Sequence, residues 1–332
     1  MSFSQRASMV PVTQKVRAYF APVERKTETP TIFDPSREGM FELESPPAPW
    51  IDLGWIDNFV RSAESSDGEL SAGAPASLLG HYRTTVGGRV EFDFREWGKL
   101  QMALAGGTQH MNVLATENDA IASPWGGTPI AATAVLEGST SSEIVVGSGS
   151  IGDFSPGDLL AIDRDYQQET GYVGAGVASA YVNDAGDVMR DPNYLRRITF
   201  NVGRVATKTS DSLLLAQPLI GGSPAEGTSA QKVVAFLDRE GGTFFQEWSA
   251  VFVHQEESGG RICFYYPRLS ASAVQQNSQR GLQKEIAIAI LQPLRALALH
   301  ACFVALPCRD QADGETVVCY RSYFPTATAA VY

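Results

Sequence analysis

The sequence has few of the residues from which metal sites and nucleophilic sites are built. Among its 332 residues are four histidines and four cysteines. The histidines are scattered along the chain: His81, His110, His254 and His300. The cysteines fall in the last quarter without a C-x-x-C pair: Cys263, Cys302, Cys308 and Cys319. Zinc sites need several such ligands at close spacing, so we expect no metal site, reduced thiols, and a core or interface role for His300.

Positive charge is also scarce. The chain has 26 basic and 37 acidic residues, and its net charge of -11 argues against a protein that grips nucleic acid by its phosphates. No apolar run reaches the length of a transmembrane helix, because residues such as Pro293 and Arg295 interrupt the longest ones. The first ten residues, MSFSQRASMV, lack the apolar segment of a signal peptide. We therefore expect no membrane insertion by this chain.

Sequence motifs of catalysis and cofactor binding are weak. Residues 147–152 read G-x-G-x-x-G, but Pro156 follows where a dinucleotide fold needs a helix, so this stretch indicates a turn. Asp163, Asp165 and Glu169 form an acidic group that could hold calcium through oxygen ligands, but the group lacks the glycine and the bidentate glutamate of an EF-hand and so indicates a solvated strand end. Neither a P-loop nor a G-x-S-x-G elbow occurs. We expect no enzyme and no catalytic, cofactor or metal residues; a hydrolase with scattered carboxylates is the enzymatic alternative.

Strand and turn signals, in contrast, are abundant, with 31 glycines and 18 prolines. The clearest unit spans residues 81–114. Within it Val90, Phe92 and Phe94 alternate with charged residues, which predicts a strand with one buried face. Helix-forming residues follow from Arg95, and Gly106-Gly107 predicts the end of a short helix.

The first fifty residues contain seven prolines, a spacing that we expect to exclude helices. Val16–Val23 predicts one short strand, and the aromatic residues of this region predict that 1–50 is an extended arm packed on its own or a neighbouring surface. Residues 51–63 predict an early strand. The Gly-, Ser-, Ala- and Glu-rich stretch Ser62–Gly80 predicts an exposed, mobile loop.

The middle of the chain predicts an inserted β module at 130–236, a small barrel or sandwich with a long exposed loop at Tyr166–Asn193. Its short strand signals are separated by turns, at 132–137, 143–146, 158–163, 197–206 and 212–217. The main β domain would comprise 51–125 and 240–332. In its second part we predict strands around 248–253 and 261–269, a strand in 285–306, and a turn at Asp313-Gly314 before 316–324.

The order of these pieces resembles the tail tube proteins (major tail proteins) of tailed bacteriophages. The stretches that carry the resemblance are PAPWIDLGWIDNFVRSA, GRVEFDFREWGKLQMALAGG, FFQEWSAVFVHQEESGGRICFYYPRL and EIAIAILQPLRALAL, and together it covers roughly 16–120 and 240–332. The resemblance implies a mainly β fold, a sandwich or barrel flanked by one short helix. It also implies subunits that assemble into stacked rings, commonly hexameric. The chain is long for such a subunit, which leaves trimeric rings of two-domain subunits as an alternative.

The resemblance also implies partners and a location. The subunit would contact copies of itself, the tape measure and other tail proteins, and DNA would pass through the lumen without sticking to an acidic wall. The protein would be assembled in the host cytoplasm and reside in the phage tail. Sheet edges at Phe92–Phe94 and Trp248–Val253 would pair within a ring, and Ser62–Gly80 and the N-terminal arm would reach the adjacent ring.

Two other functions compete with this one. The first is the tube of a contractile injection system or a gene-transfer particle. The second is a carbohydrate- or receptor-binding β module, in which tyrosines of the long loop would stack on sugars. These tyrosines are Tyr166, Tyr172, Tyr181 and Tyr194.

Overall fold

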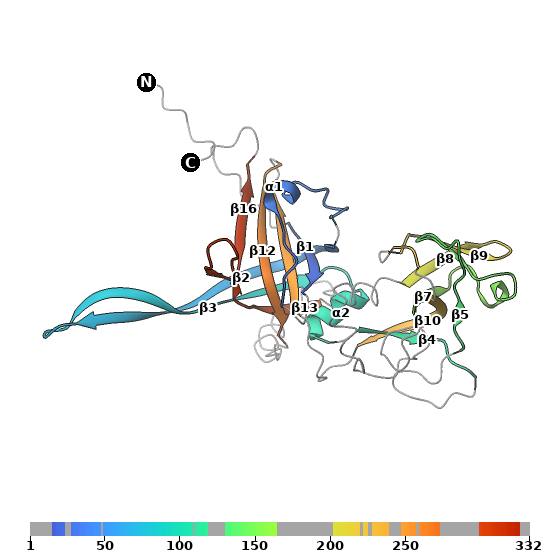
Figure 1. Cartoon of the computed structure of the whole chain (residues 1–332), viewed down its shortest axis with the longest axis horizontal. Coiled ribbons are helices and arrows are strands. Elements are labelled where there is room, and N and C mark those ends of the chain that lie inside the picture. The colour runs from blue at the N-terminus through green and yellow to red at the C-terminus, as the bar shows by residue number, and fades with distance from the viewer. Residues whose placement is uncertain are drawn as a thin grey trace, which may run out of the picture.

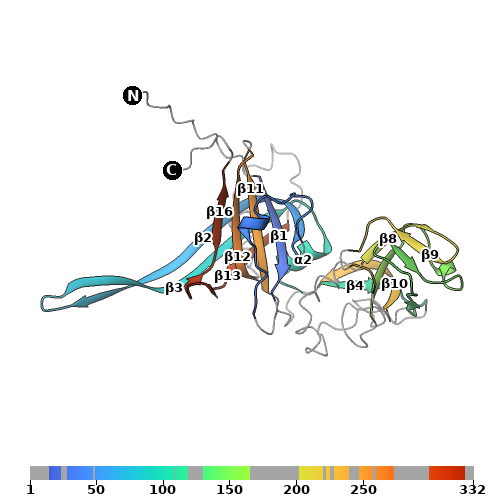
Figure 2. The same ribbon diagram turned by 45° about the horizontal axis from the view of Figure 1, so that its top comes forward.

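The computed structural model shows a mainly β protein. It describes residues 15–23, 28–47, 49–108, 110–118, 130–164, 202–219, 222–224, 228–238, 247–256, 259–272 and 299–325. In this part of the chain the longest helix is α2 (Lys99–Gly106). Two large antiparallel sheets lie side by side, and a long hairpin projects from the first sheet, away from the second (Figures 1 and 2).

The first sheet closes on itself. Its strands are β1 (Val16–Pro22), β2 (Ile51–Ala72), β3 (Ser77–Phe94), β11 (Glu247–Gln255), β12 (Arg261–Ala271), β13 (Leu299–Ala305) and β16 (Tyr320–Phe324). Because β11 pairs with both β1 and β12, the order β1-β2-β3-β13-β12-β11 returns to its start. Strand β16 pairs with β12 along the same edge of β12 that pairs with β13. We call this closed set of pairings the barrel.

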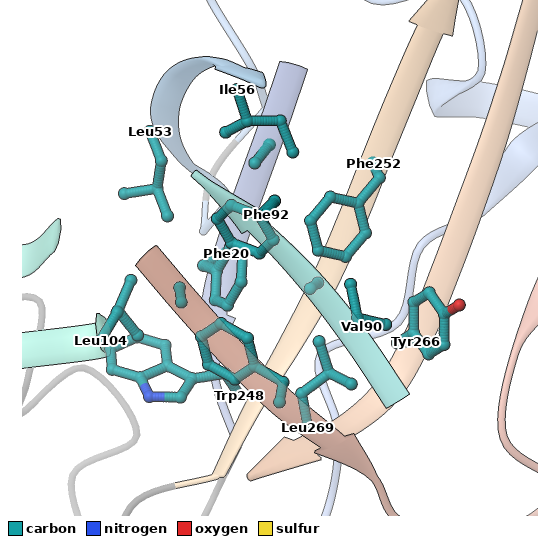
Figure 3. Close-up of a cluster of buried hydrophobic side chains, with 14 of the residues drawn as sticks. Phe20, Leu53, Ile56, Val90, Phe92, Leu104, Trp248, Phe252, Tyr266 and Leu269 are labelled. Carbon is teal, nitrogen blue, oxygen red and sulfur yellow. The ribbon is translucent and has the colours of Figure 1, made fainter. Parts of the chain in front are cut away.

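Phenylalanines fill the inside of the barrel. Phe92 stacks on Phe303 with ring centroids 5.8 Å apart, and Phe20 and Phe252 pack against it from β1 and β11. All four are fully buried, and Figure 3 shows three of them meeting. Alternation along β3 places Phe92 inward, as the sequence predicted, because successive side chains of a strand point to opposite faces.

Helix α2 packs on this same core. Leu100 and Leu104 belong to the buried cluster of the barrel, so the helix places its apolar side against the strands. The helix ends at Gly107, whose φ of 63° is the left-handed conformation that glycine adopts without strain. The predicted strand and glycine stop are therefore confirmed, and the helix begins at Lys99 rather than directly after the strand.

Residues 28–47, 49 and 50 cover the outer face of β1, β11 and β12. Phe33 and Trp50 are buried against Tyr265, so this segment packs on its own sheet. The expectation that its prolines exclude helices is wrong for one turn, α1 (Pro35–Glu38). A proline suits the first helical position, where no backbone N–H is needed, and Asp34 caps the turn by accepting the Ser36 N–H. Strand β1, which the sequence places within an extended arm, is paired on both sides in the barrel, with β11 and β2.

The second sheet has the order β4-β10-β7-β8-β9-β6, with β5 also paired to β10. Its strands are β4 (His110–Leu114), β5 (Thr133–Ala134), β6 (Glu143–Val145), β7 (Leu159–Arg164), β8 (Val202–Lys208), β9 (Ser212–Leu215) and β10 (Thr228–Asp238). It has a core of its own, which includes Ile144, Leu160 and Leu213. Each of the five predicted stretches thus contains a strand, with residues 197–201 of the fourth lying outside the described part. Strand β4, which we had assigned to the main domain, belongs to this sheet; the domain boundaries otherwise stay predictions.

The predicted loop at 166–193 falls outside the described residues. Of the strand predicted in 285–306, residues 285–298 also lie outside them, and the described part is β13 (Leu299–Ala305). The end of the chain follows the prediction. Strand β14 (Cys308–Arg309) pairs with β15 (Thr316–Val317) across the turn at Asp313-Gly314, and β16 follows.

Candidate functional site: the projecting hairpin

The barrel brings together one group of residues of types that catalyse reactions or bind metals in other proteins. Strand register places His300 opposite Asp93 and Cys302 opposite Glu91. His300 Nδ1 lies 2.8 Å from Asp93 Oδ1, and Cys302 Sγ lies 3.8 Å from Glu91 Oε1. The sequence missed these neighbours because about two hundred residues separate β3 from β13.

This group does not form a metal site or an activated nucleophile. In the described ranges no set of three or more His, Cys, Asp or Glu side chains has a metal-binding arrangement. Burial raises the pKa of the Cys302 thiol, and the charge of Glu91 raises it further, which opposes formation of the thiolate that nucleophilic catalysis requires. Asp93 Oδ2 accepts a hydrogen bond from Asn58, so its second oxygen is used structurally.

The other residues considered from sequence are dispersed. The glycine-rich stretch 147–152 leads into a 3-10 helix of three residues, η1 (Ile151–Asp153), as expected for a turn rather than a cofactor loop. His254 is buried in β11 and His81 is exposed on β3. The side chains of His110, Asp163, Asp165 and Glu169, and the four loop tyrosines, lie outside the described residues.

The most distinctive surface feature is the hairpin of β2 and β3. The pairing of β2 with β1 ends at Ile56, and the pairing of β3 with β13 ends at Gly88. The two strands nevertheless remain paired with each other from Ala63↔Gly88 to Ala72↔Ser77. We call residues 62–88 the projecting hairpin. In Figures 1 and 2 it extends well beyond every other strand of the barrel.

The prediction of a loop at Ser62–Gly80 is therefore wrong. Most of this stretch is β2 and the start of β3, with a turn at 73–76. Its polar, glycine-rich sequence reflects solvent on both faces of the ribbon, so the alternation that identifies a half-buried strand is missing. The backbone ladder forms all the same, because its N–H and C=O groups pair regardless of the side chains.

The two faces of the projecting hairpin differ in chemistry. Directly opposite residues share a face, so the pairs Gly68↔Tyr82 and Leu70↔Gly80 lie together on what we call the apolar face. The Tyr82 ring crosses over Gly68, since a Cβ atom there would lie 2.5 Å from the ring. Leu70 and Tyr82 are 57% and 56% exposed. A tyrosine and a leucine are thus displayed to solvent on a two-stranded ribbon.

The opposite face carries charge. Asp67 faces Arg83 with an N–O distance of 3.8 Å, and Glu69 is paired with His81. Asp67, His81 and Arg83 of this face, together with Tyr82, Val86 and residues 313–316, line a groove of about 640 Å³. Both members of the Asp67–Arg83 pair are more than half exposed, so the groove is a wet polar surface rather than an enclosed reaction site.

Free strand edges also lie in new places. The prediction that Phe92–Phe94 and Trp248–Val253 lie at sheet edges is wrong. At these residues β3 is paired on both sides, with β2 and β13, and β11 is paired on both sides, with β1 and β12. Within the first sheet, the described outer edges without a ladder partner belong to the projecting hairpin and to β16, while β4 and β6 are the edge strands of the second sheet. Unpaired edges of this kind are templates for pairing with another chain.

No protein-family model and no curated protein matches the chain. The structure also bears on membranes: in the described ranges, no helix has the length and apolar character needed to span one.

Proposed function

We propose that this chain is a structural virion protein, a tail tube subunit that assembles with copies of itself into stacked rings. The observation that carries the proposal is the projecting hairpin, with its unpaired edges and its exposed apolar face. A two-stranded ribbon standing alone in water is only marginally stable, and its edges invite pairing. A second copy of the chain is the partner that a self-assembling tube would supply.

The barrel suits this role because a strand with a buried anchor continues from it into the hairpin. The fully buried Phe92 anchors β3 inside the barrel, and β3 continues as one strand into the hairpin. A contact made far out on the hairpin is then transmitted to a packed core. Stacked rings need arms of this kind, because each ring must fix the position of the next.

The charge balance supports a tube through which DNA passes. A net charge of -11 disfavours lasting contact with phosphates, so a lumen lined by acidic side chains would let the genome slide through. Contacts with the tape measure and other tail proteins follow from the same proposal. A reconstruction of the assembled tube with a mainly basic inner wall would contradict this part of it.

Two alternative functions can be tested with the same purified protein. A contractile injection system or gene-transfer particle would use a similar tube. A carbohydrate- or receptor-binding role for the second sheet would depend on tyrosines outside the described residues, and glycan-array binding by a well-behaved monomer would favour it.

The deciding experiment is negative-stain electron microscopy of the purified full chain over a range of concentrations, combined with light scattering. We expect rings or tubes with a central channel, commonly six-fold, with three-fold rings as the alternative. A monomer that persists at high concentration and across salt conditions would overturn the proposal.

A further inference from the structure

We infer that Arg61 is the positioning residue that sets the direction in which the projecting hairpin leaves the barrel. This inference deepens the proposed function, since a hairpin that docks on a neighbour must be presented at a defined angle. It rests on the contacts at the base of the hairpin.

Backbone pairing alone leaves this base weakly fixed. The backbone pairing of β2 with β1 ends at Ile56, and the pairing of β2 with β3 is interrupted by a bulge between Asp57 and Val60. Strand β3 is paired with β13 only as far as Gly88. Beyond these points the described ladder joins β2 and β3 to each other alone, so it sets the shape of the ribbon but not its angle to the barrel.

Arg61 supplies the missing link across the mouth of the barrel. It lies opposite Val90, a fully buried residue, so its side chain starts on the inward face. Its Nε donates a hydrogen bond to the Tyr266 hydroxyl at 3.0 Å, and its guanidinium carbon lies 4.4 Å from the centre of the Phe264 ring. Its Nη2 lies 3.7 Å from Cys319 Sγ. One side chain thus ties β2 to β12 and to the segment before β16.

The acceptor is suited to this contact. The Tyr266 ring is packed at the edge of the core, with its hydroxyl pointing away from the other labelled side chains (Figure 3). Burial raises the pKa of Tyr266 to about 12, so the phenol stays neutral at ordinary pH and its oxygen accepts from Arg61.

An arginine is required for this combination of contacts. In the described part of the chain no carboxylate forms an ion pair with Arg61, and two aromatic rings face its guanidinium instead. A planar guanidinium can stack on a ring while its edge donates hydrogen bonds, whereas the compact ammonium of lysine cannot do both. These contacts therefore fix the orientation of the Arg61 side chain, which is needed if Arg61 sets the angle of the hairpin.

The test measures the hairpin angle directly in dilute, unassembled protein. Spin labels carried by non-natural residues at Ala76, in the hairpin turn, and at Ile32, in the segment that covers the outer face of the barrel, report one distance by pulsed electron spin resonance. Both positions are exposed, and such labels leave the native cysteines in place. We expect a narrow distance distribution for the otherwise wild-type chain and a broadened, displaced one for Arg61→Leu, which keeps an apolar stem over Phe264.

Three variants sharpen the comparison. Arg61→Lys keeps the charge and should restore only part of the narrow distribution. Tyr266→Phe keeps the ring but removes the acceptor, so it should also broaden the distribution. Arg83→Leu is the matched control: it removes the same charge from the hairpin beyond its base, at a side chain 65% exposed, and should leave the distance unchanged.

The outcomes are decisive. Unchanged distributions in Arg61→Leu and Tyr266→Phe would overturn the inference, and Tyr266→Phe decides alone if Arg61→Leu does not fold. Loss of tubes by Arg61→Leu at an unchanged distance would also overturn it, because Arg61 would then act by direct contact. If the wild-type chain never assembles, the proposed function fails, while the distance in the dilute protein still decides the role of Arg61.

Discussion

Removing the apolar face of the projecting hairpin should raise the concentration at which the protein assembles. The perturbation is the double variant Leu70→Ser/Tyr82→Ser. Both side chains are more than half exposed in the isolated chain, so their contribution to the folded subunit is small, whereas docking would bury them. The variant therefore separates assembly from folding.

The expected magnitude follows from the exposed surface. Full burial of a large apolar side chain is worth about 1.5–3 kcal/mol, so burying the exposed half of two such groups is worth roughly 1.5–3 kcal/mol per docked hairpin. Since about 1.4 kcal/mol is a factor of ten in an equilibrium constant, the association constant of each contact should fall on the order of 10- to 100-fold. The assembly threshold should rise accordingly.

The assay is light scattering against concentration, with electron microscopy of each sample. The matched control is Ile32→Ser/Val234→Ser, whose parent side chains are each 64% exposed but lie away from the hairpin. Circular dichroism should show that both double variants unfold within a few degrees of wild type. An unchanged threshold in the hairpin variant, or an equal rise in the control, would refute the reasoning.

Three further predictions concern the subunit itself. Phe92→Ala should lower the free energy of unfolding by about 3–5 kcal/mol in urea denaturation, because it leaves a cavity among aromatic rings; a loss below about 1 kcal/mol would contradict the described core. Burial raises the pKa of Tyr266 to about 12 and also raises the pKa of Tyr19 and Tyr265, so the free energy of unfolding should fall as pH rises from about 10, the unfolded value, toward 12; a flat unfolding curve across this range would argue against it. A thiol reagent should label Cys308 before the buried Cys263, whose pKa burial raises to about 12, with mass spectrometry reporting the order, and early labelling of Cys263 would contradict its burial.

Local patterns predicted the elements that one buried face defines. Val90, Phe92 and Phe94 alternate because they line a packed interior, and Gly107 ends α2 because it adopts a left-handed φ there. Five short strands of the second sheet follow from the sequence, since turns rich in glycine and serine separate them, whereas β4 and β10 were not predicted. These features depend on a few neighbouring residues, so the sequence contains them directly.

Tertiary structure alone decided how the elements are joined. The closure of β11 onto both β1 and β12 removed the edges expected at Phe92–Phe94 and Trp248–Val253. Backbone pairing turned a polar stretch into the projecting hairpin, and register brought His300 to Asp93 and Arg61 to Tyr266 across more than two hundred residues in each case. Strand pairing uses backbone groups that every sequence carries, so the partner of each strand, and with it the surface free for assembly, is determined only when the chain folds.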